Sequence, residues 1–207
     1  MKQLRLWRAV GVAILVGLPA AAEAQWLEFA QADVSPDTKS LVFVKALRSG
    51  EPLSPLLSAV YTHWDVGSTG SLGYMHRWAL TSGDHAWSVG AGVGANAFRS
   101  STASEENENA LSLRAQSEIS GPAPGGRYYA LVQLSTFRNQ VFALAQYDFG
   151  NLPVGMELSA VNETGYHHTK FALRYALDSK RHWQLRAGAI FKADETEPFV
   201  GLAFNGF

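Results

Sequence analysis

The chain of 207 residues contains no cysteine. Disulfide-stapled secreted folds, thiolate zinc sites and cysteine nucleophiles are therefore excluded. A lipoprotein anchor is excluded for the same reason, because no thiol is available to carry the lipid. The chemistry of this protein must rest on hydroxyl, imidazole, carboxylate, amide and cationic side chains.

Charge is also scarce, since Asp, Glu, Lys and Arg make up 17% of the residues and the net charge is −1. A chain with so little net charge has no global field that attracts nucleic acid, and we expect no nucleic-acid partner. Long apolar runs are missing as well. After Ala24, no apolar segment reaches the roughly 20 residues that a membrane-spanning helix needs.

The N-terminus has the pattern of a secretory signal peptide. An apolar run from Ala9 to about Ala20 leads to the small residues of “AAEA”, which ends at Ala24. The run is too short to span a membrane. Three basic residues precede it: Lys2, Arg5 and Arg8. We expect residues 1–24 to be a cleaved signal peptide and residues 25–207 to form the mature domain.

Alternation of apolar and polar residues dominates the mature chain. In “HHTKFALRYAL”, Phe171, Leu173 and Tyr175 share one face, while Lys170 and Arg174 lie on the other. The same period of two runs through “AWSVGAGVGANAF”, “NALSLRAQSEI” and “HWQLRAGAIF”. This period is typical of β-strands, and segments of about ten residues have the length of a tilted strand that crosses a bilayer.

Turn-forming sequences such as “SPDT”, “TSGDH”, “GPAPGG”, “GNLP” and “NETG” separate the alternating segments. In “FRNQV” we predict a tight hairpin at Arg138 and Asn139. The pattern predicts an all-β chain: a single antiparallel up-and-down transmembrane β-barrel of about twelve strands, with ten also possible. The expected strands are 26–33, 38–47, 56–65, 70–80, 86–98, 109–120, 127–137, 140–149, 154–161, 167–177, 182–192 and 198–207.

An even number of antiparallel strands places both chain ends on one side of the membrane. The longest connection, Arg99–Asn109, is then expected on the opposite, outer side. Aromatic residues make up 12% of the chain, and several flank the strands in the manner of interfacial girdles. These are Trp64, Trp78, Trp87, Tyr147, Phe149 and Trp183.

The sequence ends with “EPFVGLAFNGF”, in which Phe207 is the last residue of the last expected strand. In this, and in its overall architecture, the chain resembles bacterial outer-membrane β-barrel proteins, although no family-specific motif is present. The resemblance implies a Gram-negative outer-membrane location, with Phe207 as an assembly signal for the barrel-insertion machinery and with outer-membrane lipids as neighbours. A soluble periplasmic β-domain is the alternative.

Three glycines at every second position mark one strand: Gly90, Gly92 and Gly94 in “HAWSVGAGVGANAF”. A dinucleotide-binding loop needs G-x-G-x-x-G at the start of a helix, and here the third glycine comes one residue early with no helical pattern after it. We therefore place the glycines on the lumen side of a strand. There they leave room for long neighbouring side chains or for a solute, with simple filling of a tapered interior as the plainer alternative.

The face opposite the apolar one is rich in cations and amides. It supplies the candidate lumen-lining residues: Arg77, Gly90, Gly92, Gly94, Arg114, Gln116, Glu118, Gln146, Asp148, Glu157, Lys170, Arg174 and Arg186. We also assign Lys45 and Lys192 to this face. One interpretation is a basic pore that favours anions. The other is an internal plug of salt bridges that stabilises a small barrel.

No motif for a cofactor or metal site is recognisable, and we expect neither. His167 and His168 are adjacent, so on a strand they point to opposite faces and cannot ligate one ion together. No His-x-Ser pair matches the arrangement on the lipid-facing surface of outer-membrane lipid A deacylases, and we expect no enzyme.

The functional expectation is a non-enzymatic outer-membrane β-barrel, either a narrow pore with a polar lumen or a structural barrel. A small anionic or saccharide solute is the expected partner of a pore. The first alternative is an accessory barrel of surface-polysaccharide export, and the second is a lipid-modifying outer-membrane hydrolase. The oligomeric state is left open by the sequence.

Overall fold

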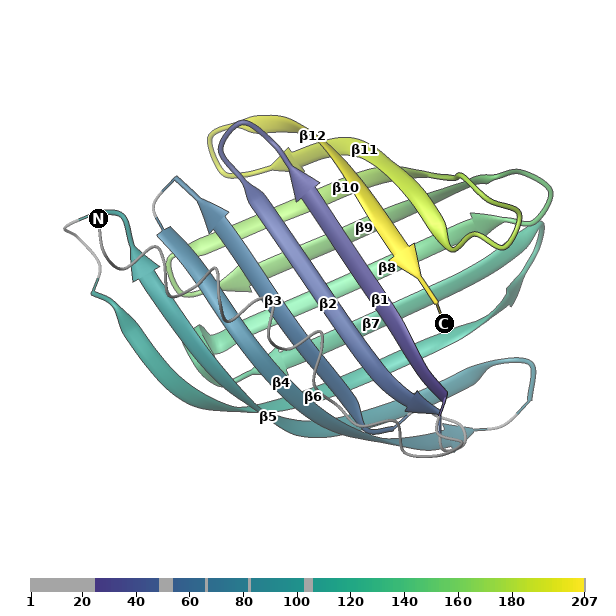
Figure 1. Cartoon of the computed structure of the whole chain (residues 1–207), viewed down its shortest axis with the longest axis horizontal. Helices are drawn as coiled ribbons and strands as arrows, with labels where there is room; N and C mark the ends of the chain where they lie inside the picture. Colours follow the sequence, from purple (N-terminus) through teal and green to yellow (C-terminus); the bar gives the residue numbers. More distant parts are fainter. Residues whose placement is uncertain (1–24, 49–53, 66, 82, 103–105, 207) are drawn as a thin grey trace.

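A computed structural model describes residues 25–48, 54–65, 67–81, 83–102 and 106–206. Twelve strands account for most of them (Figure 1). They are β1 (Gln25–Val34), β2 (Lys39–Arg48), β3 (Leu56–Trp64), β4 (Gly67–Thr81), β5 (Ala86–Ser100), β6 (Glu108–Ala123), β7 (Gly126–Ser135), β8 (Gln140–Phe149), β9 (Val154–Glu163), β10 (Tyr166–Ala176), β11 (Trp183–Phe191) and β12 (Thr196–Asn205).

The strands form one closed antiparallel barrel in which every strand pairs with its neighbours in the sequence. β1 and β12 close the barrel through pairs that run from Phe29 with Asn205 to Val34 with Val200 (Figure 1). Closure satisfies the backbone groups that an open sheet would expose at its edges, which is a requirement for any sheet that spans a bilayer. The expected up-and-down barrel is confirmed, and its strand number is twelve rather than ten.

Both ends of the described chain lie at one end of the barrel, which we call the terminal end. The connections after the odd-numbered strands form the opposite, distal end, as the even strand number predicts. The connection expected at Arg99–Asn109 does lie at the distal end. It is shorter than expected, because β5 continues to Ser100 and β6 begins at Glu108.

The turn between β7 and β8 has the predicted tight geometry. Arg138 and Asn139 adopt left-handed backbone conformations with φ of 51° and 49°. The residues Phe137–Asn139 form a single 3-10 turn. Among the described residues, no helix is long and apolar enough to span a membrane.

The two faces of the barrel follow the alternation in the sequence. Large apolar side chains such as Leu113, Leu173 and Val200 are exposed on the outer face, whereas charged side chains are buried inside. Five of the expected girdle residues lie near the terminal end of the outer face: Trp78, Trp87, Tyr147, Phe149 and Trp183. The girdle assignment of Trp64 is wrong, because its indole points into the lumen and is 1% exposed.

Two sequence-based predictions concern residues outside the described part of the chain. The signal peptide at residues 1–24 is one, and the assembly role of Phe207 is the other. Both stay predictions.

Candidate functional site

The structure places all thirteen candidate lumen residues on the inner face, at alternate positions of β4, β5, β6, β8, β9, β10 and β11. The expected inward position of Lys45 is wrong. Lys45 pairs with Glu28 across β1 and β2, on the outer face, and their side chains form a salt bridge of 3.0 Å. The pairs that flank it, Leu27 with Ala46 and Phe29 with Val44, point inward.

The most deeply buried charges form a cluster centred on Asp33 of β1. Lys170 Nζ donates to Asp33 Oδ2 at 2.9 Å, and Arg186 Nη1 contacts the two Asp33 carboxylate oxygens at 2.5 and 2.6 Å. Arg186 Nη2 donates to Glu157, which also accepts a hydrogen bond from Gln146. Because two carboxylates compensate two cations here, the cluster is close to electrically neutral, as buried charges require.

A second cluster lies on the wall formed by β4 to β7. Arg77 Nη1 donates to Glu118 at 2.6 Å, and Glu118 also accepts from Ser88 at 2.8 Å and Tyr129 at 2.9 Å. Gln116 donates to the same carboxylate at 3.2 Å. One guanidinium and several neutral donors therefore satisfy Glu118.

A third ion pair lies nearer the terminal end. Arg174 Nη2 is 3.0 Å from Asp148 Oδ1, and Arg181 of the β10–β11 connection is 3.3 Å from the same oxygen. With these pairs, most of the lumen cations that the sequence suggested are matched by carboxylates. The salt-bridge interpretation therefore accounts for Arg77, Lys170 and Arg186.

Arg114 is different, because in the described part of the chain it forms hydrogen bonds with neutral groups and no salt bridge. Its Nη2 donates to Asn96 Oδ1 at 2.9 Å, and Nη1 lies 3.5 Å from Ser58 Oγ. To reach Ser58 from β6, the side chain crosses β5 and β4 at Gly94 and Gly73, which face each other in the register. A Cβ at Gly94 would lie 2.5 Å from Arg114 Nε. The glycine row thus leaves room for a long lumen side chain, as one of the two interpretations predicted.

The other two glycines of the row have different neighbours. A Cβ at Gly90 would lie 2.8 Å from the sulfur of Met75, and one at Gly92 would overlap the backbone of β4 at Tyr74 and Met75. Gly92 therefore allows two backbones to approach closely, whereas Gly90 and Gly94 make room for side chains.

These contacts predict different consequences of adding one methyl group. Gly92→Ala should destabilise the barrel by about 1–3 kcal/mol, since the backbone of β4 must move. Gly94→Ala should have a smaller effect on stability, because the guanidinium of Arg114 can move aside. The measurement is the temperature at which the folded, fast-migrating form is lost in unboiled gel samples. Gly70→Ala is the control, because no atom lies within 4 Å of its added Cβ. Equal stability of all three variants would contradict the assignment of Gly92 to a close approach of the β4 and β5 backbones.

Aromatic side chains fill the lumen at the distal end. Trp64 of β3 stacks on Tyr166 of β10 with ring centroids 4.4 Å apart, and Phe98 of β5 lies 6.0 Å from the Trp64 ring. Phe137, from the β7–β8 turn, completes the cluster. β3 and β10 are five positions apart around a barrel of twelve strands, so their rings meet across the lumen. We call these four residues the aromatic plug.

The turn that carries Phe137 is held over the mouth by Arg138. The Arg138 guanidinium lies 4.0 Å from the centroid of the Phe98 ring, and its Nη2 donates to the carbonyl oxygen of Thr164 in the β9–β10 turn. The Thr164 amide donates back to the Arg138 carbonyl at 2.8 Å. These contacts join the distal end of β5, the β7–β8 turn and the β9–β10 turn.

A small cavity adjoins the Asp33 cluster. This cavity of about 20 Å³ lies toward the terminal end, bordered by Phe29, Gln31, Gln146, Glu157, Arg174, Gln184, Arg186, Ala203 and Asn205. Its volume is sufficient for about one water molecule.

One group of carboxylates is close enough to hold a cation. Asp37, Glu195 and Glu197 bring ligand oxygens within 4.8 Å of one another at the distal end. Lys192 already lies among them, since its ammonium contacts both Glu195 and Glu197. The Lys192 ammonium therefore offsets part of the negative charge of this acidic group.

The chain matches no known family model and no curated protein sequence. Solved structures resemble it at the level of the fold. A structure described as KdgM porin superposes with a TM-score of 0.54 at 14% identity, covering 87% of this chain and 99% of the porin. Outer membrane phospholipase A from Escherichia coli has a TM-score of 0.52 at 10% identity, covering 93% of this chain and 95% of that enzyme.

The chain has the fold of a bacterial outer-membrane β-barrel. Because the two similar proteins differ in activity, the shared fold does not distinguish a porin from a hydrolase. The distinction must come from the lumen and the outer face of this outer-membrane barrel.

Sequence reasoning missed two parts of the lumen. The first part is Asp33, which the sequence analysis did not assign to the lumen. The signal for its inward position is the alternation of Leu27, Phe29, Gln31 and Asp33 with outward residues of β1. The aromatic plug was also missed. Its residues lie at strand ends and in a turn, where a sequence pattern cannot distinguish an inward ring from an interfacial one.

Proposed function

We propose that the protein is a non-enzymatic outer-membrane barrel with a narrow polar lumen that is closed at rest at its distal end. The observation that carries this proposal is the contact between Trp64 and Tyr166 across the lumen. A constriction lined by apolar rings excludes water and blocks ions without any covalent barrier. Opening requires the Trp64 and Tyr166 rings to separate, and movement of the β7–β8 turn, which carries Phe137, would make room for them.

We further propose that the open lumen favours small anionic solutes. Arg114 supports this preference, since its charge is not matched by a carboxylate in the described residues. The paired cations contribute less, because a solute that enters the lumen meets Arg186 and Lys170 together with Asp33 and Glu157. Selectivity then depends on one guanidinium.

The comparison with porins agrees with an anionic solute. A further KdgM structure, with a TM-score of 0.51 and 13% identity, is described as a complex with disordered oligogalacturonate, an acidic saccharide. That ligand belongs to the other protein. For this chain we propose the broader class of small anions, including acidic saccharides.

Replacement of Arg114 tests the selectivity. Arg114→Gln should lower the ratio of anion to cation permeability toward unity, and Arg114→Lys should preserve anion preference, because a lumen cation attracts anions. The measurement is the reversal potential of single channels in a salt gradient. It is made on the native chain and on a Trp64→Ala, Phe137→Ala double variant, which lacks two rings of the aromatic plug. Lys39→Gln is the control, because Lys39 lies exposed at the distal end of the outer face. An unchanged permeability ratio in folded Arg114→Gln would refute the role of Arg114.

One contact on the outer face favours the hydrolase as a second candidate. His76 Nδ1 lies 3.0 Å from Ser54 Oγ, and the His76 ring packs against Trp78. A serine nucleophile must be accessible and needs a base oriented by a third group. Ser54 is buried and also accepts a hydrogen bond from the Arg77 amide, while the described contacts of His76 include no carboxylate. We therefore favour the barrel without enzymatic activity.

A further inference from the structure

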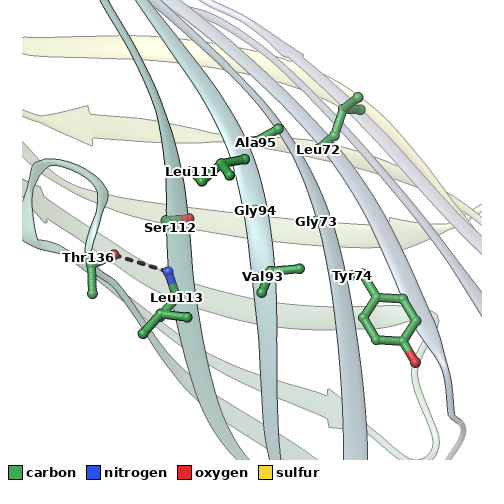
Figure 2. A pocket seen from close by; sticks show the side chains of 10 residues that line it. All are labelled: Leu72, Gly73, Tyr74, Val93, Gly94, Ala95, Leu111, Ser112, Leu113 and Thr136. Carbon is green, nitrogen blue, oxygen red and sulfur yellow. Dashed lines mark hydrogen bonds between the residues drawn. The ribbon is translucent and has the colours of Figure 1, made fainter.

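The outer face carries an apolar groove along β5, separate from the lumen (Figure 2). In cross-strand rows, Ala95 lies between Leu72 and Leu111, and Val93 lies between Tyr74 and Leu113. The floor of the groove is therefore made of small side chains and its walls of large ones. Its volume is about 620 Å³, and all of these outward side chains are exposed.

At Leu111, the β6 wall of the groove has no neighbouring strand on the side away from β5. β7 begins to pair with β6 only at Arg114, so Leu111 has no partner strand on that side in the register of the described residues. Leu111 is 85% exposed. Thr136 bounds the groove at the point where pairing begins, since its hydroxyl accepts a hydrogen bond from the Leu113 amide.

A positive charge lies beyond the distal end of the groove, on the same outward row of β5. Arg99 follows Val93, Ala95 and Ala97 on the outward face of β5. Its guanidinium donates to the carbonyl oxygens of Phe98 and Glu108 and to Asn109 Oδ1. These three bonds hold the group in place and leave two of its five N–H groups for another acceptor. Among the described residues, Arg99 forms no salt bridge.

The distance from the groove to Arg99 is comparable with the thickness of one leaflet of a bilayer. From Val93 to Arg99, six residues of strand extend about 20 Å. With a strand tilt of about 45°, this corresponds to roughly 14 Å along the bilayer normal, about half of the ~30 Å hydrocarbon core. An extended acyl chain of one leaflet is therefore long enough to reach from the groove at Val93 to a headgroup beside Arg99.

We propose that the β5 groove binds one acyl chain of a phosphate-bearing lipid of the distal leaflet, with Arg99 as the contact for its phosphate. Apolar walls and an alanine floor suit a hydrocarbon chain, and a fixed guanidinium suits a phosphate. This inference does not depend on the function of the lumen.

Native mass spectrometry of the purified, folded protein in a non-ionic detergent tests this site. The two probes are dioleoyl phosphatidic acid and dioleoyl glycerol, which carry the same chains and differ by the phosphate. The native protein should bind phosphatidic acid about tenfold more tightly than dioleoyl glycerol. Arg99→Gln should remove this difference, Arg99→Lys should retain part of it, and Ala95→Trp should weaken binding of both lipids.

Two control variants carry matched substitutions elsewhere on the outer face. Ala187→Trp fills a site between Leu173 and Val200 on the other side of the barrel, and Lys39→Gln removes another distal cation. Both should bind the lipids as the native protein does. Unchanged phosphatidic acid binding in Arg99→Gln, or unchanged binding of both lipids in Ala95→Trp, would overturn the proposal. Dimers that disappear in Ala95→Trp would also overturn it, because a second copy would then occupy the groove.

Discussion

Replacement of Trp64 and Phe137 by alanine is expected to raise the single-channel conductance several-fold and to lengthen the open time. Both side chains belong to the aromatic plug, and Trp64 forms the ring contact with Tyr166 across the lumen. Removal of the rings admits water to a mouth that is otherwise apolar, which lowers the barrier for ions. The measurement is planar-bilayer recording of the native protein and of the double variant.

Large aromatic residues in a core also contribute to stability, and their loss costs about 3–5 kcal/mol each. Folding of each variant is therefore verified first by the mobility of the unboiled sample. Trp64→Phe keeps an apolar ring and should remain closed, whereas Trp78→Ala removes an exposed indole from the outer face and should leave conductance unchanged. A folded double variant with native conductance would show that the block lies elsewhere in the lumen.

Asp33→Asn should destabilise the folded barrel by about 3–5 kcal/mol, because it leaves buried cations without their carboxylate. Asp33 is 2% exposed, and it contacts both Lys170 and Arg186. The measurement is unfolding by urea in lipid vesicles. Adding Lys170→Met to Asp33→Asn should recover part of the loss, since the number of unpaired cations falls.

The matched control is an ion pair on the outer face that includes Glu28, a residue of the same strand as Asp33. Glu28 and Lys45 form a salt bridge with side chains that are 43% and 25% exposed. Glu28→Gln should change stability by about 0.2–1 kcal/mol, because water screens such pairs. If Asp33→Asn changed stability no more than Glu28→Gln does, the cluster around Asp33 would not hold the barrel wall together.

Much of the lumen could be assigned from the sequence because side chains on a strand alternate between two faces. In β10, Lys170 and Arg174 alternate with Phe171 and Leu173, and in the structure both cations lie on the inner face. In β2 the same reasoning failed at Lys45. The segment “LVFVKALR” carries apolar residues on both faces, so the sequence contains no signal for its phase.

The sequence also could not distinguish a lumen cation that pairs with a carboxylate from one that contacts only neutral groups. Arg114 and Arg186 look alike in the alternation, yet Arg186 lies between Asp33 and Glu157, whereas Arg114 contacts Asn96. Asp33 is separated from Arg186 by 153 residues along the chain. The pairing depends on barrel closure, which brings β1 and β11 to the two sides of β12.

The sequence by itself determined the class of fold, the strand positions and most of the division between outer face and lumen, because the period of two is a local property of the extended backbone. Only the tertiary structure decided that Trp64 lies inside, that it meets Tyr166 across the lumen, and that Val93 and Ala95 of β5 form the floor of a groove between β4 and β6. These features arise between strands. They depend on register, closure and shear of the barrel, which no single segment of the sequence contains.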